Sequence, residues 1–123
     1  MKIISSLEQL DIPYYYRDFL SHFLSNVSKI EEVSRVILFG SCARGQVGER
    51  SDIDLFVITK KEISLDTEFY IMNDCPPAYN DEFYVPADII IDPENNYHRF
   101  KNSLGMVQKA VEREGIDLSE LLR

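Results

Sequence analysis

Two short apolar runs lie on either side of a glycine-containing turn in the first half of the chain. Residues 36–39 (VILF) end at Gly40, and residues 53–58 (IDLFVI) follow the turn. A continuous apolar run such as 36–39 is typical of a strand buried on both faces. A third strand is predicted over about 83–91, where Pro86 indicates a sheet edge or an irregularity. The sequence therefore predicts a small β-sheet built around these segments.

A long amphipathic helix is predicted before the first strand. Asp11 and Pro13 form a typical helix entrance, because Asp can cap free N–H groups and Pro suits the first turn. The apolar side chains that follow recur at steps of three and four residues, which predicts a helix over about 13–31. They are Tyr16, Phe19, Leu20, Phe23, Leu24, Val27 and Ile30.

A second amphipathic helix is predicted after the third strand, over about 93–114. The same capping pattern precedes it, and its apolar side chains again step by three and four residues as far as Gly115. These are Tyr97, Phe100, Leu104, Val107 and Val111. Residues 60–81 are expected to form a partly helical connection, because the sequence DCPP at 74–77 breaks a helix that begins near Thr67.

Composition narrows the possible functions of the chain. Its 123 residues suit one domain, 1–123. Thirteen basic and 21 acidic residues give a net charge of -8, which disfavours a long nucleic acid as partner.

The two cysteines, Cys42 and Cys75, lack a CxxC spacing, so we expect reduced thiols in the cytoplasm. With only two histidines in addition, we expect no zinc site. We expect neither a signal peptide nor a membrane span, since no apolar run approaches the roughly 20 residues required.

Asp52 and Asp54 are the first candidates for chemistry. Two residues apart at the start of a strand, they project from the same face roughly 7 Å apart. Two like charges held together are unfavourable unless a cation neutralises them, and carboxylate oxygens suit Mg²⁺ or Mn²⁺. The competing interpretation is a solvated pair of carboxylates at a strand end. For an Asp-x-Asp sequence with no other motif beside it, we would favour that interpretation.

The turn before these aspartates favours the metal interpretation. Gly40 after a buried strand lets backbone N–H groups approach a phosphate, and Ser41 can add its hydroxyl. Arg44 either lies over the phosphates or is a solvated turn residue, and the sequence leaves both open. Phosphate and metal would then meet at one place.

A third carboxylate is expected if the site holds two metal ions, about 3.5 to 4 Å apart, for an in-line displacement. Asp88 is the candidate, because a charged residue among apolar neighbours should have a partner or a metal. Asp92 faces the same side by strand alternation and competes for the role. Its alternative role is to cap the helix that begins at Pro93.

The segment resembles the nucleotidyltransferase superfamily of the DNA polymerase beta type, and within it the minimal nucleotidyltransferases. Gly40 and Ser41, ten intervening residues and Asp52-x-Asp54 reproduce its signature, and Asp88 before three isoleucines resembles its third-carboxylate strand. The resemblance covers about 33–91.

The resemblance implies a fold, a catalytic core and a set of ligands. The fold would be one α/β (α+β) domain with a small mixed sheet, helices packed mainly on one face and the three aspartates on the other, with a catalytic core over about 33–92. The cofactors would be two Mg²⁺ ions, with Mn²⁺ possible, and the nucleotide would be an NTP, ATP by preference. Asp52 and Asp54 would hold both ions, and Asp88 the catalytic one, near the acceptor hydroxyl.

The acceptor stays open at this point. One reading resembles the antitoxin of a toxin–antitoxin pair, which adenylylates a tyrosine of a helical HEPN-class ribonuclease. A second resembles the aminoglycoside nucleotidyltransferases, whose cationic drug suits an acidic protein but which usually carry a further helical domain. A third is a binding module that keeps the fold without catalysis.

Overall fold

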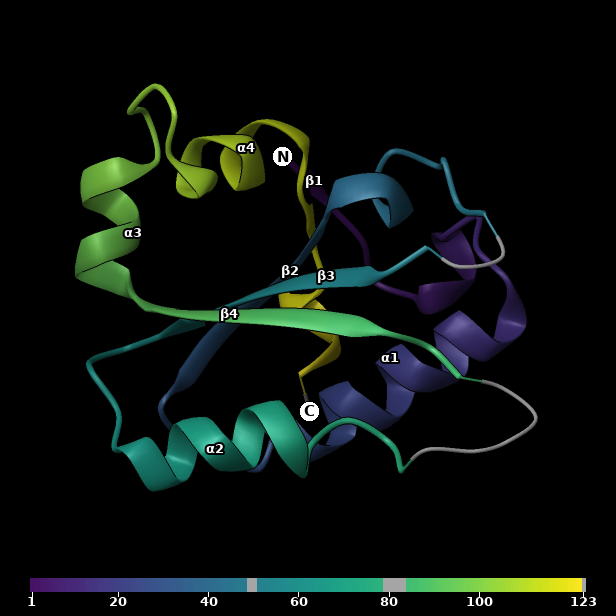
Figure 1. The fold of residues 1–123 in the computed structure, drawn as a ribbon, viewed down its shortest axis with the longest axis horizontal. Helices are drawn as coiled ribbons and strands as arrows, with labels where there is room; N and C mark the ends of the chain where they lie inside the picture. Colours follow the sequence, from purple (N-terminus) through teal and green to yellow (C-terminus); the bar gives the residue numbers. More distant parts are fainter. Residues whose placement is uncertain (49–50, 79–83, 123) are drawn as a thin grey trace.

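A computed structural model describes residues 1–48, 51–78 and 84–122, and its centre is a five-stranded mixed sheet (Figure 1). The strand order is β1-β5-β2-β3-β4. The strands are β1 (Lys2–Ile3), β2 (Val33–Phe39), β3 (Ile53–Thr59), β4 (Ala87–Pro93) and β5 (Ile116–Asp117). β2 pairs antiparallel with β3 and β5, whereas β3–β4 and β1–β5 are parallel. The predicted mixed sheet is confirmed, and β4 is an outer strand.

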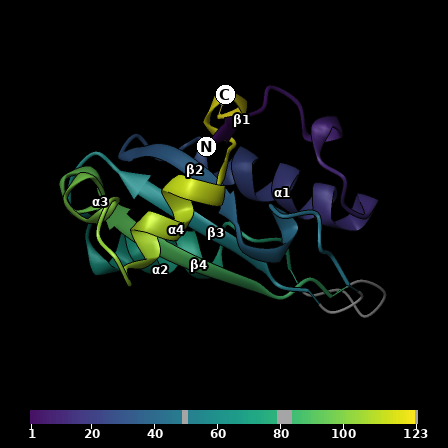
Figure 2. The same ribbon diagram turned by 90° about the horizontal axis from the view of Figure 1, so that it is seen from above.

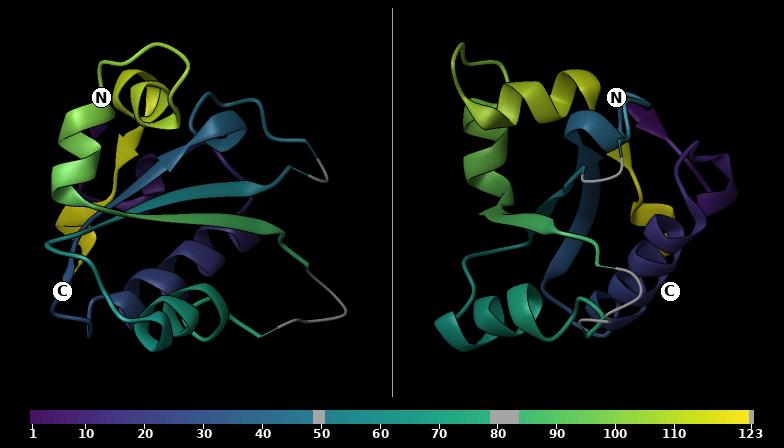
Figure 3. Two further views of the ribbon diagram at one scale, coloured as in Figure 1. Left: turned by 60° about the vertical axis from the view of Figure 1, so that its left-hand side comes forward. Right: turned by 45° about the vertical axis from the view of Figure 1, so that its right-hand side comes forward.

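One face of the sheet carries α1 (Tyr14–Val27) and α2 (Leu65–Asn73), as Figure 3 shows. Alternate residues of β2 and β3 point into this layer and form the larger core with the buried face of α1. The buried α1 side chains are Tyr16, Phe19, Leu20, Phe23, Leu24 and Val27. They match the predicted apolar stripe, although α1 ends four residues earlier than expected and Pro13, not Asp11, is its N-cap.

The other face carries α3 (Glu94–Phe100) and α4 (Val107–Glu114) over a smaller apolar cluster (Figure 2). The cluster consists of Ile37, Phe56, Ile58, Tyr97 and Val111. The single helix predicted over 93–114 is wrong, because the chain leaves the helical path at 101–106 and Gly105 takes a φ of 80° there. The face expected to be free of helices is therefore partly covered.

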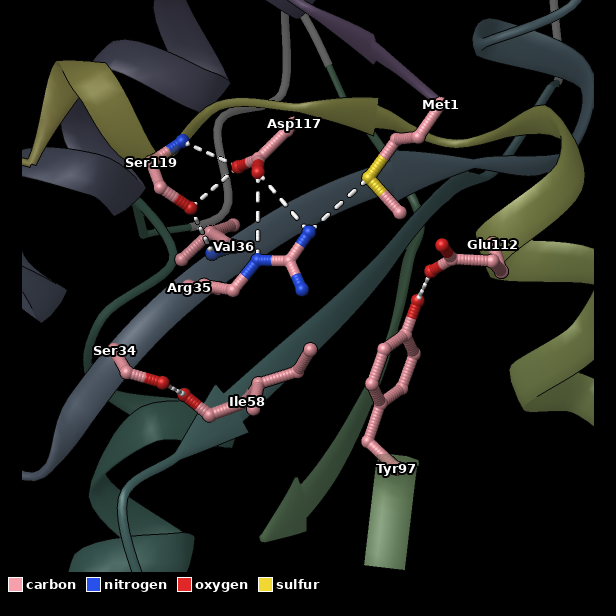
Figure 4. A network of polar contacts seen from close by, with 9 residues as sticks. All are labelled: Met1, Ser34, Arg35, Val36, Ile58, Tyr97, Glu112, Asp117 and Ser119. Atoms are coloured by element: carbon pink, nitrogen blue, oxygen red, sulfur yellow. Dashed lines mark hydrogen bonds and ion pairs between the residues drawn. The ribbon is translucent and has the colours of Figure 1, made fainter. Parts of the chain in front are cut away.

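Polar contacts fasten the short terminal strand β5 and the two late helices (Figure 4). The Arg35 guanidinium on β2 lies 3.1 Å from the Asp117 carboxylate on β5, and Ser119 donates its backbone N–H to the same carboxylate at 2.9 Å. The buried Tyr97 hydroxyl donates to Glu112, which joins α3 to α4. Neither terminal strand was predicted, since two residues show no periodicity.

The boundaries of two strands differ from the predicted ones. β2 begins three residues before the predicted start, and β4 runs from Ala87 rather than from about residue 83, which lies outside the described residues. The connection contains α2, and the described part of the chain also has three 3-10 turns. They are η1 (Leu7–Gln9), η2 (Gly40–Cys42) and η3 (Ser119–Leu121). None of the described helices has the length and apolar character needed to cross a membrane.

Candidate active site

The parallel pairing of β3 and β4 brings two of the predicted aspartates side by side. Asp54 is the direct register partner of Asp88, and adjacent strands lie about 4.8 Å apart. Asp52 stands just before β3, and it is near enough for its charge to act on Asp54. Asp54 is half-buried, whereas Asp52 and Asp88 are exposed. The three predicted carboxylates thus gather where β3 and β4 begin.

Electrostatics at this place disfavour three ionised carboxylates. Burial, followed by the charges of Asp88 and Asp52, raises the pKa of Asp54, and Arg44 acts in the opposite direction. A divalent cation would remove this repulsion, and a set of carboxylate oxygens is the donor chemistry that Mg²⁺ and Mn²⁺ prefer. Across 1–48, 51–78 and 84–122, no three His, Cys, Asp or Glu side chains already converge as a metal cluster. The donor set fits the ions, and exposed Asp52 and Asp88 have the rotational freedom to close around them.

The turn after β2 rests directly on Asp54. Gly40 has a φ of 73°, and a Cβ at this position would lie 2.2 Å from Oδ2 of Asp54. The Gly40 carbonyl accepts hydrogen bonds from the backbone N–H groups of Ala43 and Arg44, both at 3.1 Å. Glycine is therefore required here twice, for its backbone conformation and for its lack of a side chain. Ser41 follows in η2, and its hydroxyl has no hydrogen-bond partner among the described residues.

Two contacts that the sequence did not reveal hold the segment leading into β3. The Tyr16 hydroxyl on α1 donates to the Ser51 carbonyl at 2.6 Å, and the Cys42 thiol lies 3.4 Å from the Asp52 carbonyl. Burial, followed by Asp54 and Asp52, raises the pKa of Cys42 to about 11, so the thiol stays protonated. Both cysteines are free, which agrees with the predicted reduced thiols, and both are buried. Tyr16 belongs to an apolar stripe, and nothing in that pattern marks its hydroxyl as a long-range donor.

Arg44 is exposed, but its side chain makes polar contacts with α4 and with its own turn. Its guanidinium lies 3.1 Å from the Glu114 carboxylate and donates to the Gln46 side chain at 3.2 Å. Both members of the ion pair are partly exposed, so the pair contributes little to stability. The interpretation of Arg44 as a solvated turn residue therefore misses its contacts with Glu114 and Gln46. A contact between Arg44 and a phosphate would require the ion pair with Glu114 to open, or the guanidinium to bind both groups at once.

Asp92 lies apart from the other aspartates. It pairs in register with Ile58 and stands four residues along β4 from Asp88, about 13 Å away. Its buried carboxylate accepts hydrogen bonds from Asn96 at 2.6 Å and Gln108 at 3.2 Å. The N-cap of α3 is Pro93, without a side-chain cap. Asp92 is thus neither placed to join Asp52 and Asp54 nor the predicted helix cap; it fastens α3 and α4 to the sheet.

An open cleft of about 470 Å³ begins at the aspartates and extends over the edge strand. Its lining combines two carboxylates with apolar side chains of β2, β4 and α2. The lining residues are Phe39, Asp54, Met72, Ala87, Asp88, Ile89 and Ile90. The site therefore has a polar end and an apolar end.

The chain is similar to known nucleotidyltransferases in sequence and in fold. The model of the polymerase beta nucleotidyltransferase family matches residues 20–104. A "putative protein adenylyltransferase" of Methanocaldococcus jannaschii is 31% identical over 78 residues, which cover 62% of this chain and 74% of that protein. The crystal structure of a "putative nucleotidyltransferase" from Sulfolobus solfataricus superposes with a TM-score of 0.50 at 25% identity, over 69% of this chain and 73% of the other. This chain belongs to the polymerase beta nucleotidyltransferase family.

Proposed function

We propose that this nucleotidyltransferase uses divalent metal to transfer AMP from ATP to a hydroxyl group of a protein, a tyrosine of a HEPN-class partner. The observation that supports this proposal most is that Asp54 and Asp88 are directly paired on adjacent strands, beside the Gly40 turn. Positioning and charge neutralisation dominate phosphoryl transfer, and this arrangement supplies groups for both.

Each residue has a separate task in this proposal. The Gly40–Ser41 turn would bind the phosphates, Asp52 and Asp54 would hold two Mg²⁺ or Mn²⁺ ions, and Asp88 would be a further ligand of the catalytic ion. Bound divalent ions would neutralise phosphate charge and stabilise the attacking and leaving oxygens. Arg44 lies within electrostatic reach of Asp54, and from there it would add positive charge beside the phosphates.

The transfer step forms one bond and breaks one. The acceptor oxygen attacks the α-phosphorus of ATP, its bond to phosphorus forms, and the bond from that phosphorus to the oxygen bridging to the β-phosphorus breaks. Pyrophosphate leaves. Asp88 orients the acceptor hydroxyl and accepts its proton, since an exposed carboxylate beside Asp54 is within reach of a group entering from the β4 edge.

A protein acceptor is favoured over an aminoglycoside by one comparison. The relative from Methanocaldococcus jannaschii carries a protein adenylyltransferase name. The HEPN-class partner rests on the family resemblance of the motif.

The direct test is label transfer from ATP labelled on its α-phosphate, with Mg²⁺ and a HEPN-class protein encoded beside this gene. We expect wild-type protein to place AMP on a tyrosine of that protein. Asp88→Asn should lower transfer by at least ~100-fold and retain most ATP binding, the loss expected when one transition-state stabiliser is removed. Asp18→Asn, an exposed carboxylate on α1, is the control that should transfer normally. Label on aminoglycosides alone would establish the drug-modifying alternative, and ATP binding without transfer to either acceptor would establish the binding module.

A further inference from the structure

The helix α2 has two apolar faces, and only one of them packs on the rest of residues 1–48, 51–78 and 84–122. Ile71 is fully buried and joins the larger core. Leu65, Phe69 and Met72 recur at steps of four and three residues, so they share one stripe on the helix. Their exposed fractions are 83%, 64% and 44%. An apolar stripe held in water on a folded helix is typical of a surface that a partner covers.

This stripe is continuous with the catalytic cleft. Met72 lines the cleft together with Asp54, Asp88 and Ile90. The strand order places the Gly40 turn at the end of β2, Asp54 on the next strand and Asp88 on the outer strand, with Met72 beyond it. A nucleotide on the β2 side therefore leaves the β4 and α2 side as the approach for the acceptor.

Charge restricts what can cover the stripe. Asp66 and Glu68 lie in the first turn of α2 and Asp74 is its C-cap, and the helix carries no Lys or Arg. The whole chain has a net charge of -8. A second copy of this chain would bring like charges together, whereas a surface with an apolar centre and basic rim would be attracted.

We infer that the stripe of Leu65, Phe69 and Met72 is the docking surface for the acceptor protein, which meets it with an apolar centre flanked by basic side chains. This inference rests on the proposed function and adds how the acceptor is chosen. Docking on α2 positions the acceptor hydroxyl over Asp88 through the apolar end of the cleft. The surface acts on acceptor binding and leaves nucleotide binding unchanged.

Leu65→Gln and Phe69→Gln test the surface, because Gln keeps helix propensity and neither residue lines the cleft. Leu104→Gln is the matched control, since Leu104 is 86% exposed but follows α3 on the opposite side of the sheet (Figure 1). Each variant is incubated with Mg²⁺, ATP labelled on its α-phosphate and a lysate of the cells that encode the protein. Binding of ATP with Mn²⁺ is measured by calorimetry on the same samples.

We expect wild type and Leu104→Gln to label the same protein, and the double variant Leu65→Gln/Phe69→Gln to label it at least 10-fold less with unchanged ATP affinity. Raising NaCl to 0.5 M should lower wild-type labelling, since the charge attraction is screened. Labelling that is equal in the double variant overturns the docking surface alone. If wild type binds ATP but labels no protein, the proposed protein acceptor is overturned, and the docking role with it. A wild-type dimer by ultracentrifugation that the double variant abolishes, with labelling unchanged, would instead assign the stripe to a contact between copies.

Discussion

At the scale of single residues, Gly40 determines where the Asp54 carboxylate lies. Its φ of 73° and the 2.2 Å approach to Oδ2 of Asp54 leave no room for a side chain. Gly45 has a similar φ of 70°, but a Cβ there meets nothing within 4 Å. A substitution at Gly45 therefore has only the free-energy cost of the left-handed backbone, whereas a substitution at Gly40 also has the steric cost of the contact with Asp54.

We predict that Gly40→Ala and Gly45→Ala each lose about 1–2 kcal/mol of unfolding free energy from the left-handed backbone, with a further loss for Gly40→Ala. Only Gly40→Ala should weaken ATP binding with Mn²⁺, by at least ~10-fold, because Asp54 must move. Urea unfolding and titration calorimetry measure the two effects. Equal ATP affinity in both folded variants would show that the Gly40 contact does not position the ligand.

We expect the Asp54 carboxylate to lower the stability of the metal-free protein although the proposed metal site requires it. Burial and the charges of Asp88 and Asp52 raise its pKa in the folded protein above the ordinary 3.8. Stability from this group is therefore fully present below pH 3.8 and is lost as the pH rises through the folded-state pKa. At neutral pH the ionised carboxylate destabilises the metal-free fold.

We predict that Asp54→Asn raises the melting temperature of the metal-free protein at pH 7 by a few degrees and abolishes Mn²⁺-dependent ATP binding. The gain should shrink as the pH falls toward 3.8, where wild-type Asp54 is also neutral. Calorimetric melting at several pH values tests this. A lower melting temperature for Asp54→Asn than for wild type at pH 7 would contradict the repulsion argument.

At the scale of elements, a side-chain hydrogen bond links α1 to the segment that leads into β3. The Tyr16 hydroxyl donates to Ser51, next to Asp52, whereas the Tyr97 hydroxyl donates to Glu112 on the other side of the sheet. Both tyrosines are buried. Removing either hydroxyl leaves a comparable defect, but only one lies beside the candidate site.

We predict that Tyr16→Phe and Tyr97→Phe each lose about 1–2 kcal/mol of stability, the usual loss for a buried hydrogen bond. Tyr16→Phe should also lower the AMP transfer rate about 3- to 10-fold through a less constrained Asp52. Single-turnover transfer, measured well below both melting temperatures, separates the effects. Equal rates in the two variants would make the Tyr16 contact purely structural.

Sequence patterns predicted those elements whose side chains alternate or repeat over many residues. The α1 stripe and the cores of β2 and β3 follow directly from such patterns. The predicted helix over 93–114 failed because apolar spacing continues through Leu104, which is 86% exposed, while Gly105 turns the chain. The pairing of β1 with β5 joins residues at opposite ends of the chain, and no local pattern encodes it.

The candidate site was predictable only in part for a similar reason. The spacing of Asp52 and Asp54 fixes their shared face locally, and the register that places Asp88 beside Asp54 agrees with the motif. Asp92 competed with Asp88 for the role of third carboxylate because strand alternation predicts only the face on which a residue lies. It does not predict how far along the strand that residue is from Asp52 and Asp54. Its hydrogen bonds to Asn96 and Gln108 depend on how α3 and α4 fold back, which the sequence pattern misjudged.

At the scale of the whole molecule, the net charge of -8 should couple the proposed binding of nucleotide to the proposed binding of metal. ATP is itself an anion, and three carboxylates gather at the place where its phosphates would lie. Without divalent ions, the protein should therefore repel ATP, and without ATP the ions lack phosphate oxygens as ligands. Each ligand should bind more tightly in the presence of the other, and the coupling must be equal in both directions.

We predict that ATP with EDTA leaves the melting temperature nearly unchanged, whereas ATP with Mn²⁺ stabilises the fold by about 2.7 kcal/mol when ligand reaches about 100 times its Kd. The control Asp52→Asn/Asp54→Asn should lose this joint stabilisation, because its carboxylate ligands are gone although its fold and its Gly40 turn remain. Thermal melting with each ligand alone and with both gives the coupling, and calorimetric titration in either order tests its reciprocity. Stabilisation by ATP in EDTA equal to that with Mn²⁺ would mean that nucleotide binds elsewhere, since no arrangement of unneutralised aspartates beside the Gly40 turn can attract a polyphosphate.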